Sequence, residues 1–293
     1  MKVEKWQALG NDYLIIERSE IPWDLSAPRI RRLCNPHFGL GSDGVCLVSE
    51  PESGGSAARV AIFNPDGSRA ELSGNGVRQV ALYLHSHGRV EAAEFAIETD
   101  AGLVRPRIIS ESEARVGMGK ATTVSQDYPD GDADGKGVIE AGGREWDFQH
   151  VSIGNPQCAV EVDQGLEELD LAQIGAEIEQ AQLFPNRTNV SFWSRQSDSA
   201  NAVIRARIFE RGVGETLSSG TGASGAATAA HLSGLNSPIE VELDGGSLMV
   251  EIDPDLNVHL TGWAVPVYQA ELSARLISEI EAEIEFPSLG TTA

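Results

Sequence analysis

The sequence carries one short pattern twice, and each copy opens a stretch with helical character. Residues 72–76 read LSGNG, and residues 217–222 read LSSGTG. A run of residues that favour helix follows each copy, and a glycine, Gly88 or Gly234, stands where each run ends. We therefore expect two helices that begin at Ser73 and Ser219.

Helix starts of this kind attract anions. The first turn of a helix has backbone N–H groups without internal partners, and the helix dipole adds positive charge there. After Gly222 the second helix contains only Ala, Gly, Ser and Thr up to His231. Side chains this small let a helix lie close to other backbone, so we expect the second helix to be buried.

Short strands, rather than alternating β-α-β units, surround each predicted helix. Strands are expected at 3–17 (strand, turn, strand), 45–48, 59–63, 95–109, 147–162, 203–209, 238–252, 257–262 and 263–272, and further helices at 27–35 and 167–181. Because the same theme recurs in both halves, we infer an internal duplication. The expected fold class is α+β with two pseudo-symmetric domains, divided within the acidic segment 111–136.

Composition limits the classes of partner. The chain has 293 residues, of which 41% are hydrophobic, and a formal net charge of -22. These values fit a two-domain globular protein and disfavour nucleic acid or an anionic membrane as partner. No apolar run reaches the length of a membrane span, and the N-terminus does not read as a signal peptide, so we expect a cytoplasmic protein.

Cysteines and cofactor motifs give little sign of a bound group. Cys34, Cys46 and Cys158 form no CxxC motif, and we expect them to be buried as small apolar residues. The sequence lacks the motifs of dinucleotide sites, P-loops and zinc hydrolases. It therefore suggests no metal and no nucleotide cofactor.

Seven segments, in order along the chain, resemble the diaminopimelate epimerase family. They are 10–13 (GNDY), 38–44 (FGLGSDG), 63–78 (FNPDGSRAELSGNGVR), 97–102 (IETDAG), 151–157 (VSIGNPQ), 184–190 (FPNRTNV) and 210–224 (ERGVGETLSSGTGAS). The resemblance covers nearly the whole chain and implies that each half wraps a β-barrel-like sheet around a central helix. It implies an N-terminal domain of residues 1–118 with the returning segment 263–293, and a C-terminal domain of residues 119–262. It also implies a homodimer, an active site between the halves, and no cofactor.

The chemistry of the family depends on two residues that differ here. The family inverts an amino acid α-carbon with two bases, which are cysteines placed directly before each Gly-[Asn/Thr]-Gly turn. In this chain those positions hold Ser73 and Ser219. A thiol ordinarily has a pKa of about 8.5, tuned downward at helix N-termini, whereas a serine hydroxyl is inert unless a base activates it. The family's helper histidine is Gln157 here, and Gln79 and Ser224 stand at two further positions that are usually cysteine. So many changes favour natural divergence over an engineered variant.

The residues that would bind substrate match the family more closely. By this resemblance, backbone N–H groups hold the reacting α-carboxylate and stabilise its charge as the α-proton leaves, at Gly74, Asn75, Gly220 and Thr221. Asn64, Asn189 and Arg211 clamp the distal amino acid end, where Arg fits a carboxylate bidentately. Asn11 and Asn155 line the cleft. Glu210 lies near the reacting ammonium and could also act as a base.

We therefore expect an epimerase or racemase of the lysine and peptidoglycan precursor pathway, which acts without a cofactor on a small amino acid such as diaminopimelate. Ser73 and Ser219 should face each other. Epimerisation should be slow or absent, with residual chemistry one-sided through Glu210. Two alternatives stay open: an isomerase, racemase or dehydratase of another amino acid, and a non-catalytic paralogue that binds an amino acid.

Overall fold

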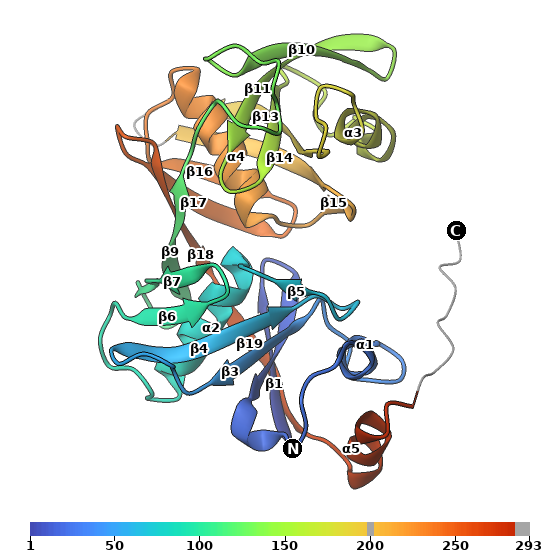
Figure 1. Ribbon diagram of the computed structural model, residues 1–293. Coiled ribbons are helices and arrows are strands. Elements are labelled where there is room, and N and C mark those ends of the chain that lie inside the picture. Colours follow the sequence, from blue (N-terminus) through green and yellow to red (C-terminus); the bar gives the residue numbers. More distant parts are fainter. Residues whose placement is uncertain (198–201, 285–293) are drawn as a thin grey trace. The chain divides into compact units, whose positions relative to one another are not determined.

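Two units divide the computed structural model, which describes residues 1–197 and 202–284 (Figure 1). Unit 1 contains Met1–Ala114 and the described part of Ala264–Ala293, and unit 2 is Arg115–Trp263. The segment in which we expected a boundary contains a strand, β9 (Glu113–Lys120). Its buried Ala114 and Val116 alternate with more exposed residues, as in a strand with one covered face.

Unit 1 is built on one sheet. Its strands are β1 (Lys2–Ala8), β2 (Asn11–Glu17), β3 (Val45–Ser49), β4 (Ser56–Phe63), β5 (Arg69–Ala70), β6 (Ala96–Thr99), β7 (Gly102–Val104) and β19 (Val265–Glu271). The sheet order is β19-β1-β2-β3-β4-β6-β7, with β5 paired to β4. The helices are α1 (Ala27–Cys34), α2 (Gly74–Ser86) and α5 (Ala274–Glu281), with a 3-10 turn at Arg18–Glu20. The short β8 (Arg107–Ile108) lies next to β9.

Unit 2 has a second sheet. Besides β9, its strands are β10 (Lys136–Ala141), β11 (Arg144–Ser152), β12 (Pro156–Glu161), β13 (Asn189–Ser197), β14 (Ala202–Glu210), β15 (Gly214–Thr216), β16 (Ile239–Leu243), β17 (Gly246–Ile252) and β18 (Asn257–Trp263). They run in the order β10-β11-β12-β13-β14-β16-β17-β18-β9, with β15 paired to β14. The helices are α3 (Leu171–Glu179) and α4 (Gly220–Leu232).

The two units repeat one pattern of strand pairing. In unit 1, β2 is parallel to β3, and β4 is antiparallel to β3 and β5 but parallel to β6. In unit 2, β12 is parallel to β13, and β14 is antiparallel to β13 and β15 but parallel to β16. Helix α2 follows β5 just as α4 follows β15. The predicted duplication and the α+β fold class are therefore confirmed.

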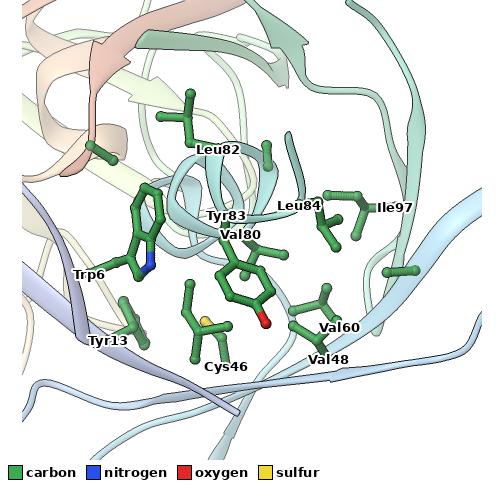
Figure 2. Packing of buried hydrophobic residues seen from close by; sticks show 14 of the residues in the cluster. Trp6, Tyr13, Cys46, Val48, Val60, Val80, Leu82, Tyr83, Leu84 and Ile97 are labelled. Carbon is green, nitrogen blue, oxygen red and sulfur yellow. The ribbon is translucent and has the colours of Figure 1, made fainter. Parts of the chain in front are cut away.

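Helix α2 is the centre of the core of unit 1. Its buried Val80, Ala81, Leu82 and Leu84 belong to one hydrophobic cluster with side chains from the surrounding strands. Figure 2 shows Val80, Leu82 and Leu84 in this cluster. An apolar residue that is fully buried contributes about 1.5–3 kcal/mol. The hydrophobic cluster therefore fixes where α2 begins relative to the sheet.

Helix α4 is buried without large side chains. All residues from Gly222 to Ala230 are buried. A Cβ atom at Gly222 would lie 2.7 Å from Cγ2 of Ile208, so the backbone of α4 and the side chains of β14 meet too closely for anything larger. The expectation that small side chains let this helix be buried is confirmed.

The remaining helices carry less of the core. Helix α5 is amphipathic, as the sequence suggested, and buries Ile280, while residues 287–293 lie outside the described residues. Among the described residues, no helix is long and apolar enough to cross a membrane.

The substitution Gly175→Ala tests how closely α3 packs against β14, because its two effects on stability oppose each other. Alanine favours helix over glycine by about 1 kcal/mol, which would stabilise α3. The new Cβ, however, would lie 2.6 Å from Cγ and 2.8 Å from Cβ of Phe209, and the position of the Phe209 Cβ is fixed by the backbone of β14. We expect overpacking to win and the free energy of unfolding to fall by about 1–2 kcal/mol in urea titration.

The matched control is Gly117→Ala in β9. There the nearest atom to a new Cβ is Cδ2 of His259 at 3.9 Å, an ordinary contact. This variant should be as stable as the original protein or slightly more stable. Equal stability of both variants would contradict the close approach of α3 to β14.

Candidate active site

The two pattern serines are the N-caps of α2 and α4. The Ser73 hydroxyl accepts a hydrogen bond from the Gly76 N–H at 3.1 Å, and the Ser219 hydroxyl accepts one from the Gly222 N–H at 3.2 Å. Their backbone angles are nearly the same, with φ of -138° and -139°. Serine is among the best N-cap residues, and replacing it by alanine typically costs about 1 kcal/mol. Each serine therefore has a structural role, whatever its chemistry.

Glu210 meets Ser219 within unit 2. Glu210 is the last residue of β14, and its Oε1 accepts a hydrogen bond from Oγ1 of Thr216 at 2.9 Å. Burial raises the pKa of Glu210, and hydrogen bonds with Thr216 and Ser219 offset part of this effect. A carboxyl group with a raised pKa is a better proton acceptor near neutral pH than an ordinary one.

Ser73 has a different neighbour in unit 1. The Tyr13 hydroxyl donates to Oγ of Ser73 at 3.3 Å, and the Tyr13 ring is buried among the side chains that surround α2 (Figure 2). Sequence reasoning did not select Tyr13 as a site residue. The signal was present in the repeat, because the GNDY of residues 10–13 corresponds to the GNPQ of residues 154–157.

The predicted residues Asn11 and Asn75 lie together. Nδ2 of Asn75 donates to Oδ1 of Asn11, and Nδ2 of Asn11 donates to Oδ2 of Asp43, both at 3.0 Å. Arg78 donates to Oδ1 of Asn75 at 2.7 Å, and complete burial lowers the pKa of Arg78 to about 10. This chain of hydrogen bonds fixes both amides at the start of α2. Gly74 is the first residue of that helix.

Asn155 and Thr221 form the corresponding contact in unit 2. Nδ2 of Asn155 donates to Oγ1 of Thr221 at 3.3 Å, and Nε2 of Gln157 donates to Oδ1 of Asn155 at 2.8 Å. Gly220 is the first residue of α4. Polar side chains thus support both helix starts, in units that fold alike.

Asn189 and Arg211 also lie together, but the Asn189 amide is committed to the backbone. Its Nδ2 donates to the Pro156 carbonyl at 3.1 Å, and its Oδ1 accepts from the Arg211 N–H at 2.9 Å. The Arg211 side chain is exposed and donates from Nη1 to the Asn186 carbonyl at 2.9 Å. Glu210 and Arg211 therefore have separate partners. The Asn64 amide donates within its own turn, to Oγ of Ser68 at 2.9 Å.

The three cysteines do not replace the missing thiols. All are free and buried, as the sequence suggested. Burial raises the pKa of Cys34 to about 11 and raises the pKa of Cys46 and Cys158 further. The thiols are therefore protonated at neutral pH. Within the described residues, no group of three or more His, Cys, Asp and Glu could hold a metal ion.

Three other residues that depart from the family pattern are buried in the core. Gln79, Gln157 and Ser224 are completely buried. Gln79 donates from Nε2 to the Asn11 carbonyl at 3.0 Å. Gln157 lies so close to α4 that a Cβ at Gly225 would come within 2.8 Å of its Cβ. These glutamines hold the strands against the two helices.

Comparisons with known proteins agree with the sequence segments. The profile of the family described as diaminopimelate epimerase matches residues 3–124 and 149–266. "Diaminopimelate epimerase 2" of Nostoc sp. is 37% identical over 95% of this chain and 98% of its own length. The diaminopimelate epimerase of Moorella thermoacetica is 36% identical over 92% of this chain and 99% of its own length.

Solved structures share the fold at low identity. A probable proline racemase from Agrobacterium radiobacter has a TM-score of 0.64 at 16% identity, over 93% of both chains. A hydroxyproline epimerase from Agrobacterium vitis, with bound trans-4-hydroxy-L-proline, has a TM-score of 0.63 at 18% identity, over 92% of this chain and 91% of its own.

The environment of Glu210 predicts a pH effect on stability. Burial raises the pKa of Glu210 in the folded state. The contribution of Glu210 to folding stability is therefore fully present below the unfolded pKa of about 4.3, and it is lost as pH rises through the folded pKa. Glu210→Gln keeps the shape but cannot ionise. The free energy of unfolding of the variant minus that of the original protein should therefore be larger at pH 7.5 than at pH 4, because only the original protein is destabilised as Glu210 ionises.

Urea titration at the two pH values measures this difference. Glu145→Gln, at an exposed position on β11 of the same unit, controls for the loss of one carboxyl group. If the Glu210→Gln difference is the same at both pH values, the Glu210 carboxyl is not desolvated.

Proposed function

Because this chain belongs to the diaminopimelate epimerase family and is therefore an isomerase, we propose that it inverts the α-carbon of diaminopimelate or a closely similar amino acid. The relatives support this reaction class, since they match more than nine-tenths of the chain. The proposed reaction is a proton transfer and uses no cofactor. Its place would be in the supply of lysine and peptidoglycan precursors.

The observation that carries the proposal is the Glu210–Ser219 pair at the start of α4. A carboxyl group whose pKa burial raises lies against a hydroxyl at a helix N-terminus. In the proposed reaction the free N–H groups of Gly220 and Thr221 hold the α-carboxylate, where they also stabilise the charge that develops as the α-proton leaves. Glu210 then accepts that proton, directly or through Ser219.

The second proton transfer, which returns a proton to the α-carbon, would take place at the start of α2 in unit 1. Gly74 and Asn75 would offer N–H groups in the same way, and Ser73 would return a proton to the α-carbon. The amides of Asn11 and Asn155 would line the substrate. Asn64, Asn189 and Arg211 would each bind its distal amino acid end, with Arg211 on the distal carboxylate. Because serine is a far weaker acid than cysteine, we propose that inversion is slow compared with relatives that carry both thiols.

Two further proposals concern the protein rather than its site. The family resemblance supports a homodimer, which sedimentation can test. A cytoplasmic location is supported by three free buried thiols, since reducing compartments keep thiols unpaired.

The double substitution Ser73→Cys with Ser219→Cys tests the proposed chemistry. Thiols at helix N-termini ionise near neutral pH and hydroxyls do not, so the variant has a thiolate available as the base and should interconvert L,L- and meso-diaminopimelate at least about tenfold faster than the original protein. Cysteine is a poorer N-cap, so a loss of about 1 kcal/mol of stability per site is expected as well. Equal rates would show that serine is competent here. Binding without turnover in both proteins would favour an amino-acid-binding paralogue.

Substrate recognition is tested by Arg211→Lys. A point ammonium cannot reproduce the guanidinium fork, so the KM for a dicarboxylic substrate should rise by about tenfold or more. Arg105→Lys, at an exposed position of unit 1, is the matched control. An unchanged KM in Arg211→Lys would remove Arg211 from the binding site.

A further inference from the structure

The side-chain oxygen of Ser73 accepts two hydrogen bonds. Oγ accepts one hydrogen bond from the Gly76 N–H at 3.1 Å and a second from the Tyr13 hydroxyl at 3.3 Å. A hydroxyl oxygen has two lone pairs and one hydrogen, so both lone pairs are used and the hydrogen is left to point elsewhere. Because Ser73 is only partly buried, that hydrogen can reach a bound molecule.

Tyr13 is held firmly in this position. Its side chain is 6% exposed, and a Cβ at Gly44 would lie 2.6 Å from Cε1 of the Tyr13 ring. The Tyr13 ring therefore occupies space that a side chain at position 44 would need. The hydrogen bond to Ser73 is long for two hydroxyl groups, but catalytic hydrogen bonds often tighten only when the substrate is bound.

The internal repeat places Tyr13 at a position with a counterpart. Tyr13 follows Gly-Asn-Asp at the start of β2, and Gln157 follows Gly-Asn-Pro at the start of β12. Each strand runs parallel to its neighbour, β3 or β13. In unit 2, Gln157 bonds Asn155 and the serine partner is Glu210, whereas in unit 1 the serine partner is Tyr13.

The two serine partners differ in acidity. A glutamic acid side chain ordinarily has a pKa of about 4.3 and a tyrosine about 10, so near neutral pH a carboxyl group is the natural proton acceptor and a phenol the natural donor. The serine at α4 therefore has an acceptor beside it, and the serine at α2 has a donor.

We propose that Tyr13 is a positioning residue for the inversion: it holds Oγ of Ser73, directs the Ser73 proton outward, and replaces that proton once it has moved to the substrate. This inference rests on the proposed function. As the α-carbon–hydrogen bond forms, the Ser73 O–H bond breaks. The Tyr13 O–H bond then breaks as a new Ser73 O–H bond forms, and the resulting tyrosinate takes a proton from water. The negative charge thus ends on a phenol rather than on the much more basic serine oxygen.

The test is the variant Tyr13→Phe, which keeps the ring and removes only the hydroxyl. The control is Tyr83→Phe, because Tyr83 lies in the same hydrophobic cluster, is 7% exposed, and donates its hydroxyl to Glu17 instead. Interconversion of L,L- and meso-diaminopimelate is measured for both variants, for Ser73→Ala, and for the double variant Tyr13→Phe with Ser73→Ala. Circular dichroism and urea titration check that each variant folds.

Tyr13→Phe should lower kcat at least about tenfold and change KM little, while Tyr83→Phe should keep the original kcat. Since Tyr13 acts through Ser73, the double variant should be no slower than Ser73→Ala alone. The inference is overturned if Tyr13→Phe behaves like Tyr83→Phe, or if the losses from Tyr13→Phe and Ser73→Ala multiply. If the original protein interconverts nothing, the proposed function and this inference both fail. If it does and only the Tyr13 results disagree, the proposed function stands.

Discussion

A single kind of hydrogen bond fixes the start of both central helices, from the backbone N–H of the third helical residue to the hydroxyl of the serine that precedes the helix. It leaves the earlier N–H groups of each helix free, and these are the groups that we propose hold the α-carboxylate. Glycine at the third position is part of the same constraint, since a Cβ at Gly76 would lie 3.3 Å from Sγ of Cys46 and one at Gly222 would lie 2.7 Å from Ile208. The same pattern of strand pairing surrounds both helix starts.

Compared with cysteine, serine at the N-cap makes the helix more stable but is less reactive. A serine N-cap contributes about 1 kcal/mol, and the thiol that the family has at these positions would ionise far more readily near neutral pH and so provide a base. The structure gives each hydroxyl a neighbour that can handle protons, Glu210 beside Ser219 and Tyr13 beside Ser73. The two neighbours come from different positions of the repeat. The duplicated fold therefore places unlike partners beside the two serines, which supports the proposed reaction, in which one proton is removed and another is returned.

Local features of the sequence predicted most of what is local in the structure. The Ser-Gly-x-Gly pattern located both helix starts, because capping depends on a few neighbouring residues, and the small residues of α4 predicted its burial. Strand β9 was missed because only Ala114 and Val116 are buried, and charged residues and two glycines interrupt its apolar pattern.

Contacts between distant residues were harder to predict. The hydrogen bond from Tyr13 to Ser73 joins residues that are 60 positions apart, and it depends on a strand register that composition does not reveal. Glu210 and Arg211 are adjacent in sequence, yet Glu210 ends β14 and Arg211 begins the turn that follows, so their side chains have different partners. Consequently Glu210 lies with Thr216 and Ser219, while Arg211 bonds the Asn186 carbonyl.

The central claim is that the serines at α2 and α4 and their unlike partners move the α-proton of an amino acid. The most direct measurement is mass spectrometry of L,L- and meso-diaminopimelate incubated in D2O with the original protein. The account predicts that deuterium enters the α-carbon from either epimer at unequal rates, because a carboxyl group serves one serine and a phenol the other. Saturable binding of both epimers with no deuterium in either would contradict it.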